Sequence, residues 1–201
     1  DGFGGYRAQL VAELSAKGIK DLAVLRAVSL VPRHLFVPES VRHRAYEDSA
    51  LPIGGGQTIS QPWVQARSLE LARLTGRERV LEVGTGSGYQ TALLAQCAEQ
   101  VFSIERLAPL AQRAREALTA AGVKNVSVMV GDGTLGWRPY APYDAIIVSA
   151  GSPEVPQPLV DQLAPGGRLI VPIGDRGAQA LTLCTRAPDG HVDCQTVSDV
   201  R

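Results

Sequence analysis

Short apolar runs alternate with helix-like segments from residue 76 onwards, and this alternation restricts the fold more than any other feature of the chain. The first run spans residues 80–83, ends at a cluster of glycines, and is followed by a helical pattern at residues 89–97. Four further runs repeat the arrangement, at residues 101–104, 126–130, 144–148 and 168–173. Apolar strands separated by helices are typical of parallel sheets that are covered on both faces. We therefore expect an α/β fold with a Rossmann-like, doubly wound, mostly parallel sheet.

The last part of the chain has a different pattern. Two strand-like runs, at residues 180–185 and 192–197, flank the turn signal Pro188-Asp-Gly190. This pattern predicts an antiparallel C-terminal hairpin at the edge of the sheet.

The N-terminal part alternates helix with loop. Residues 6–29 and 62–74 have apolar side chains at helical spacing. Repeated prolines and glycines exclude a long regular element from residues 31–62, and a loop of this length in a compact domain is often functional. We expect one compact unit, in which a helical and loop cap on the substrate side, residues 1–75, covers an α/β core, residues 76–201.

Charge and hydropathy narrow the classes of function. The chain has 20 Lys and Arg and 20 Asp and Glu, so its formal net charge is zero, whereas a dedicated nucleic-acid binder usually shows a basic excess. No apolar run approaches the roughly 20 residues that span a bilayer. We therefore expect neither a nucleic-acid nor a membrane partner. One basic cluster is interpreted as a solvated surface, with a site for phosphate or an acidic substrate as the alternative: Arg33, His34, Arg42, His43 and Arg44.

The cysteines are Cys97, Cys184 and Cys194. Their number is odd, and their spacing matches neither a zinc site nor a redox motif. We interpret them as reduced, packed thiols, which favours a cytoplasmic protein, and we expect no metal site.

A glycine turn between residues 83 and 89 is the sharpest local signal. Gly84, Gly86 and Gly88 allow a tight turn and let a ligand approach the main chain. Backbone amides at the start of the following helix suit a polar or anionic ligand. The dinucleotide fingerprint requires a glycine where this chain has Tyr89, so a nicotinamide oxidoreductase is disfavoured.

Acidic residues follow the next two strands. Glu105 comes 21 residues after Gly84, where a carboxylate can accept both hydroxyls of a ribose. Asp132 follows the strand after that, where its carboxylate can accept from an adenine amino group. Adenosine without a pyrophosphate, as in S-adenosylmethionine, fits this set. The alternatives are a plain glycine turn, a surface acid at Glu105 and a helix cap at Asp132.

The segment before the core groups hydroxyls, an amide and glycines directly ahead of a helix. Thr58 and Ser60 can present donors to a substrate. In the alternative interpretation, Ser60 or Gln61 caps the helix that begins at Pro62.

Seven segments resemble those of the protein-L-isoaspartate O-methyltransferase family, over roughly residues 6–197. The glycine turn and PGGRLI occur in many methyltransferases, whereas VPRHLFVP and QTISQP are much more specific. The segments are VPRHLFVP (31–38), DSALPI (48–53), QTISQP (57–62), VLEVGTGSGYQT (80–91), GDG (131–133), PYDAII (142–147) and PGGRLI (165–170).

The resemblance implies a repair enzyme that moves the methyl group of S-adenosylmethionine to the α-carboxylate of L-isoaspartyl residues in damaged proteins and peptides. S-adenosylhomocysteine is the implied second product, and the methyl ester then collapses to a succinimide. Ser60 is the implied catalytic residue, and substrate binding is implied for Asp48, Thr58, Ile59 and Ser60. The implied cofactor-binding residues are Gln57, Thr58, Ile59, Ser60, Glu82, Gly84, Thr85, Gly86, Ser87, Gly88, Glu105, Arg106, Asp132 and Gly133. We expect a monomer.

Two alternative functions remain open at this point. Family members usually continue into a final strand of the type RFVPL, whereas this sequence stops at Arg201. A catalytically impaired form that still binds S-adenosylmethionine is therefore one alternative. A methyltransferase for another small substrate or RNA is the other.

Overall fold

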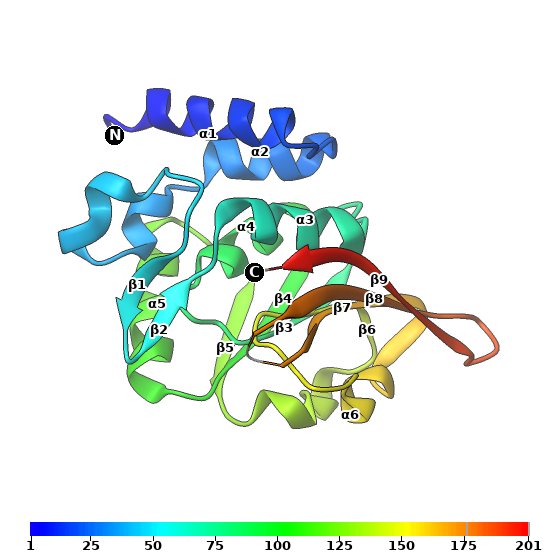
Figure 1. The fold of residues 1–201 in the computed structure, drawn as a ribbon. Coiled ribbons are helices and arrows are strands. Elements are labelled where there is room, and N and C mark those ends of the chain that lie inside the picture. The colour runs from blue at the N-terminus through cyan, green and yellow to red at the C-terminus, as the bar shows by residue number, and fades with distance from the viewer. Residues whose placement is uncertain (176, 201) are drawn as a thin grey trace.

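The structure is a computed structural model that describes residues 1–175 and 177–200, the last three by their backbone alone. A seven-stranded sheet forms its centre, in the order β5-β4-β3-β6-β7-β8-β9 (Figure 1). The pairs from β5 to β7 are parallel, and those from β7 to β9 are antiparallel. The strands are β3 (Arg79–Val83), β4 (Gln100–Glu105), β5 (Val126–Val130), β6 (Tyr143–Val148), β7 (Leu163–Gly174), β8 (Gln179–Arg186) and β9 (Val192–Val200). The predicted doubly wound sheet with an antiparallel C-terminal hairpin is confirmed.

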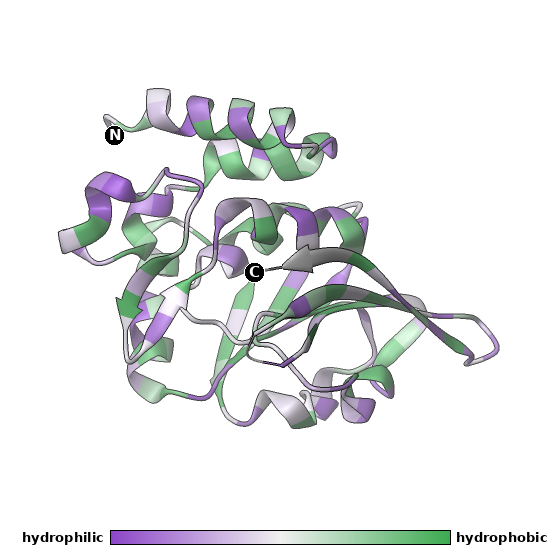
Figure 2. Cartoon of the chain, in the orientation of Figure 1, coloured by the Kyte–Doolittle hydropathy of each residue, from purple (hydrophilic) through white to green (hydrophobic). Residues whose placement is uncertain are grey.

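Strand β3 shows why helices cover both faces of the sheet. Successive side chains of a strand point to opposite faces. Val80 accordingly packs into one core cluster, and Leu81 and Val83 pack into another. The helices α3 (Pro62–Ala72), α4 (Tyr89–Cys97) and α5 (Ala108–Ala120) contribute to the first cluster, and α6 (Gln157–Val160) contributes to the second. Figure 2 shows the hydrophobic residues along the central strands between these layers.

The N-terminal helices pack onto the outer side of α3 and α4 (Figure 1). They are α1 (Gly4–Ala16) and α2 (Leu22–Leu30), and Leu10 and Val24 join the same core cluster as the first face of the sheet. The next segment contains two 3₁₀ helices, η1 (Arg33–Phe36) and η2 (Glu39–Arg44). A β-hairpin follows, made of β1 (Leu51–Gly54) and β2 (Gln57–Ile59). This hairpin was not predicted, and three consecutive glycines with φ between +62° and +89° form its turn.

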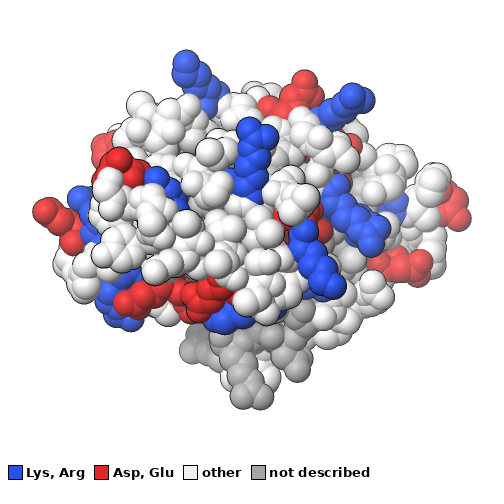
Figure 3. All heavy atoms as spheres, turned by 90° about the horizontal axis from the view of Figure 1, so that it is seen from above, with Lys and Arg blue, Asp and Glu red and all other residues white. Residues whose placement is uncertain are grey.

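The interpretation of the basic cluster as a solvated surface is wrong for two of its members. Arg33 and His34 are buried, because η1 turns them inward. Nδ1 of His34 lies 2.8 Å from the Tyr46 hydroxyl, and its ring stacks on Phe3. His43 is exposed, as expected. On the face shown in Figure 3, basic and acidic side chains are interspersed without a patch of one sign.

The prediction of three reduced cysteines is also wrong. Cys184 and Cys194 form a disulfide, because the β8–β9 register places them directly opposite each other, with their Cα atoms 4.0 Å apart. Cys97 is a free, buried thiol, as predicted. The cysteines therefore no longer support a cytoplasmic location, which stays a prediction. No helix within the described residues is long and apolar enough to cross a membrane.

Candidate active site

An open cavity of about 180 Å³ lies at the carboxyl ends of β3 and β4, beside the β1–β2 hairpin. Strand β3 pairs with β4 on one side and β6 on the other, so the connections diverge here, which is where open α/β sheets bind ligands. The residues that line the cavity are Gln57, Thr58, Ile59, Ser60, Gln65, Gly84, Thr85, Gly86, Ser87, Gln90, Glu105, Ser149 and Ala150. Nine of these were predicted as site residues.

The glycine turn is held tightly against its neighbours. The amides of Gly84 and Thr85 both donate to the Ile104 carbonyl, at 2.8 and 3.1 Å. Gly88 has a φ of +89° and presses on α5, where a Cβ on this residue would lie 3.2 Å from the Cβ of Ala114. The turn therefore presents its backbone to the cavity in a fixed position, while Gly88 itself faces α5.

Glu105 is buried at the end of β4 and lines the cavity, so the alternative of a surface acid is wrong. Its Oε1 accepts from the Gly86 amide at 2.9 Å, and its Oε2 accepts from the Leu107 amide at 2.8 Å. Each carboxylate oxygen can accept a second hydrogen bond, so the group can still bind a ligand hydroxyl.

Glu82 lies beneath the turn, fully buried and outside the cavity lining. It accepts hydrogen bonds from the hydroxyls of Ser103 and Thr91 and from the amide of Gln90. Gln90 also donates to the Ser149 hydroxyl at 3.0 Å, so Glu82 positions groups that do line the cavity. Burial raises the pKa of Glu82 to about 7.

Ser60 follows β2 and is half-buried at the cavity wall. Its carbonyl accepts a hydrogen bond from Nη2 of Arg33 at 2.9 Å. Ile59 is buried, whereas Gln57 and Thr58 are exposed to solvent. The QTIS segment and the glycine turn thus face each other across one cavity.

Asp48 does not line the cavity. Its Oδ1 accepts from the Trp63 amide at 2.8 Å, at the start of α3. Its Oδ2 accepts from Lys17 at 2.7 Å and from Gln61 at 3.2 Å. Asp48 therefore caps α3 from a distance, and the alternative that Ser60 or Gln61 supplies that cap is wrong, since neither side chain does so.

Three further predicted residues also lie outside the lining. Arg106 and Asp132 are exposed, and Gly133 packs against Val83, which leaves no room for a Cβ. Asp132 accepts from the amide and hydroxyl of Thr134, at 3.0 and 2.7 Å, and these bonds lower the pKa of its carboxyl. The cap of η3 (Gly133–Leu135), named above as an alternative, is therefore formed.

Four lining residues were missed. Ser149 and Ala150 follow β6, so the rule that located the glycine turn at the end of β3 also locates them. Gln65 and Gln90 lie on helices, where no motif distinguished them from packed or solvated polar residues.

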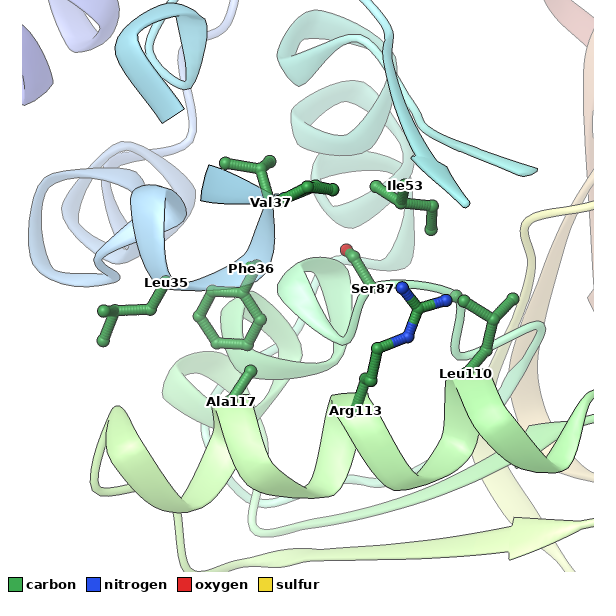
Figure 4. Close-up of a pocket in the computed structure, with 10 residues that line it drawn as sticks. Leu35, Phe36, Val37, Ile53, Ser87, Leu110, Arg113 and Ala117 are labelled. Carbon is green, nitrogen blue, oxygen red and sulfur yellow. The ribbon is translucent and has the colours of Figure 1, made fainter. Parts of the chain in front are cut away.

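A second cavity, of about 150 Å³, adjoins the first and shares Gly86 and Ser87 with it. Figure 4 shows its mainly apolar walls, with Arg113 of α5 directed towards Ser87 and Ile53. Nη1 of Arg113 lies 3.2 Å from the point where a Cβ on Gly54 would sit. A Cβ there would require only a small shift of this flexible guanidinium, whereas the φ of +89° at Gly54 is the stronger reason for a glycine at this position.

The family model for Protein-L-isoaspartate(D-aspartate) O-methyltransferase matches residues 6–201. Protein-L-isoaspartate O-methyltransferase 1 from Syntrophobacter fumaroxidans is 56% identical over 178 residues, which are 89% of this chain and 83% of the relative.

Two solved structures have the same architecture. A protein-L-isoaspartate O-methyltransferase superposes with a TM-score of 0.87 at 31% identity, and the match covers 97% of this chain and 64% of that one. A β-aspartate methyltransferase from Plasmodium falciparum, in complex with S-adenosyl-L-homocysteine, has a TM-score of 0.83 at 28% identity. That match covers 96% of this chain and 94% of the other.

Proposed function

This chain belongs to the protein-L-isoaspartate O-methyltransferase family, and on that premise we propose that the cavity beside β3 and β4 is its active site. The reaction is transfer of a methyl group from S-adenosylmethionine to the α-carboxylate of L-isoaspartyl residues in damaged proteins and peptides. The observation that carries the proposal is that one cavity unites the QTIS segment, the glycine turn and Glu105.

The cofactor side of the cavity suits S-adenosylmethionine. The backbone of residues 84–87 would hold its polar end, and Glu105 would accept from its ribose. Bound S-adenosylmethionine supplies an activated methyl group on a positively charged sulfur. We retain Arg106, Asp132 and Gly133 as proposed contacts at the adenine end, since they follow β4 and β5 at the same edge of the sheet.

The substrate side of the cavity needs to orient a carboxylate rather than to remove a proton. A carboxylic acid with a pKa of about 4 is already ionised at pH 7, so no strong general base is required. Thr58, Ile59 and Ser60 would align the carboxylate, with the Ser60 hydroxyl as its donor. Holding reactants in line can supply about 7–11 kcal/mol of the barrier.

The alternative functions are not favoured. Relatives that carry the enzyme's name, at 56% and 52% identity over most of this chain, favour an active enzyme over a catalytically impaired form. A small-molecule methyltransferase conflicts with the same names and with the match of the family model to residues 6–201.

We also propose that two parts of one monomer form the substrate side and the cofactor side of the cavity. Residues 1–75 form the substrate-side cap and contribute the QTIS segment, and residues 76–201 form the cofactor-binding core. Because one chain supplies both sides of the cavity, a second copy is not needed. The molar mass in solution, measured by light scattering during size-exclusion chromatography, tests whether the protein is a monomer.

The proposed function is tested by methyl transfer from labelled S-adenosylmethionine to a peptide with one L-isoaspartate. The control is the same peptide with normal aspartate. We expect label only on the isoaspartyl peptide, in a base-labile ester. Equal labelling of both peptides, or of neither while the cofactor binds, would contradict the proposal.

A further inference from the structure

Arg33 is a buried cation that the function described so far does not use. Its side chain in η1 is 0% exposed. Nη1 donates to Oε1 of Gln65 at 2.9 Å, and Nη2 donates to the Ser60 carbonyl at 2.9 Å. The guanidinium also lies over the ring of Tyr89, 4.5 Å from its centroid. Because Gln65 and Ser60 both line the active-site cavity, Arg33 lies directly behind its wall.

No carboxylate among the described residues forms an ion pair with Arg33. Its two hydrogen-bond acceptors are neutral, and its Nε has no hydrogen-bond partner. Asp48 acts on it only at longer range, and that carboxylate is already paired with Lys17 at 2.7 Å. A buried charge without a counter-charge is strongly unfavourable, so the positive charge behind the cavity wall calls for a role.

We propose that Arg33 is a positioning residue for the substrate carboxylate, acting through Ser60 and Gln65 and through its uncompensated charge. This inference rests on the proposed function. The guanidinium fixes two groups that face the cavity, and the isoaspartyl carboxylate brings the counter-charge that the described residues lack. A charge in a poorly polarisable wall acts more strongly on a ligand than one in water.

The same charge distinguishes substrate from product. The carboxylate is anionic before methyl transfer, and the methyl ester is neutral afterwards. The attraction by Arg33 therefore ends with the reaction, which favours release of the methylated peptide.

The first test compares neutral and charged replacements of Arg33. Arg33→Met and Arg33→Gln remove the charge, whereas Arg33→Lys keeps it but cannot reproduce the two-pronged hydrogen bonding. We expect the KM for the isoaspartyl peptide to rise about tenfold or more in the neutral variants, as for a lost charge-assisted interaction. In Arg33→Lys we expect a lower kcat with a smaller change in KM. Two neutral variants are included because one of them can fail to fold.

The matched control is Arg42→Met. Arg42 donates from Nε to the His34 carbonyl at 3.1 Å in the same segment, but it does not line the active-site cavity. Its KM and kcat should stay at the wild-type values. Neutral Arg33 variants that fold and keep the KM of Arg33→Lys would overturn the proposal.

The second test separates charge from mere structural support. S-adenosylmethionine and S-adenosylhomocysteine differ by one methyl group and by the positive charge on sulfur. The positive charge of Arg33 should repel the positive sulfur, so removing that charge should improve the affinity for S-adenosylmethionine relative to S-adenosylhomocysteine severalfold. Arg33→Lys keeps the charge and should leave the ratio of the two Kd values unchanged. Equal weakening of both ligands, measured by calorimetry, would overturn the electrostatic role.

These two tests also separate this inference from the proposed function. A wild-type protein that fails to methylate the isoaspartyl peptide contradicts the proposed function. The ratio of Kd values needs no peptide, so it still decides whether Arg33 exerts its charge in the cavity.

Discussion

The Ser60 side chain is the residue on which the proposed chemistry depends most. Its backbone is held by Arg33, so Ser60→Ala should remove the hydroxyl without moving the segment. We expect kcat at saturating isoaspartyl peptide to fall about ten- to hundredfold, as for one lost hydrogen bond to a charged group. Steady-state kinetics check this, with Ser29→Ala, an exposed hydroxyl on α2, as the control. Full turnover by Ser60→Ala would exclude the assigned role.

Glu82 should make the stability of the protein depend on pH. Burial raises the pKa of its carboxyl from 4.5 to about 7, so between these values the folded state keeps a proton that the unfolded state releases. The contribution is therefore complete below pH 4.5 and is lost as the pH rises through 7, by up to about 3 kcal/mol.

Glu82→Gln tests this dependence, because its side chain is neutral at every pH. Urea unfolding at pH 5, 6 and 7 should show a smaller loss of unfolding free energy in Glu82→Gln than in the wild type. An identical slope in both proteins would show that Glu82 ionises normally.

The role of a single residue was predictable where a local motif determines its backbone conformation. It was less predictable where the side chain forms hydrogen bonds with residues distant in sequence. The glycine turn follows from three glycines with positive φ between a strand and a helix. Asp48 and Arg33, in contrast, make their hydrogen bonds to residues 15 and 32 positions away in sequence. No local pattern reveals such partners, which explains the errors over the α3 cap and the basic cluster.

At the scale of elements, the junction of the glycine turn with α4 depends on close packing against α5. Gly88→Ala combines a φ of +89° with a Cβ placed 3.2 Å from Ala114, whereas Gly122→Ala meets a φ of +76° and nothing within 4 Å. The positive φ should cost each variant about 1–2 kcal/mol of unfolding free energy. Gly88→Ala should lose more than this, because its Cβ is also crowded by Ala114. Thermal or urea unfolding measures the difference, and equal losses would refute the packing argument.

The disulfide should stabilise the β8–β9 hairpin. It closes a loop with a sequence separation of 10, which in the chain-entropy model contributes about 2–3 kcal/mol. Cys194→Ser should lose this amount, and a reducing agent should destabilise the wild type but leave Cys194→Ser unchanged. Cys97→Ala is the control, because its thiol is free. A reducing agent with no effect on wild-type unfolding would contradict the expectation.

Helices and strands were most predictable where their apolar residues follow a clear periodic pattern. The helix expected at residues 89–97 has those bounds. Strand β7, in contrast, begins at Leu163, before the apolar run at residues 168–173 that predicted it. The β1–β2 hairpin has only short strands around its glycines, so its sequence looks like a loop until the partner strand is known.

At the scale of the whole molecule, the open cavity predicts that ligand binding stabilises the fold. S-adenosylhomocysteine at a free concentration of 100 times its Kd should raise the free energy of unfolding by about 2.7 kcal/mol. Differential scanning calorimetry should show a higher Tm with ligand, and Glu105→Gln should show a smaller rise. No rise in the wild type at saturation would contradict the assignment of the cavity.

The architecture of the molecule was more predictable than its site. Alternating strands and helices lead to few topologies, because parallel connections are almost always right-handed. The substrate side was less predictable, since it depends on how residues 31–62 fold back onto α3 and α4 through contacts distant in sequence.

The contact between Arg33 and Tyr89 has a practical consequence for spectroscopy. A guanidinium 4.5 Å from the centroid of an aromatic ring is shielded by the ring current. The chemical shifts of its nuclei should therefore differ from those of the solvated arginines. Burial also slows the exchange of its protons with water. The protein thus carries an intrinsic magnetic-resonance label behind its cavity, which can report occupancy of the site without any added probe.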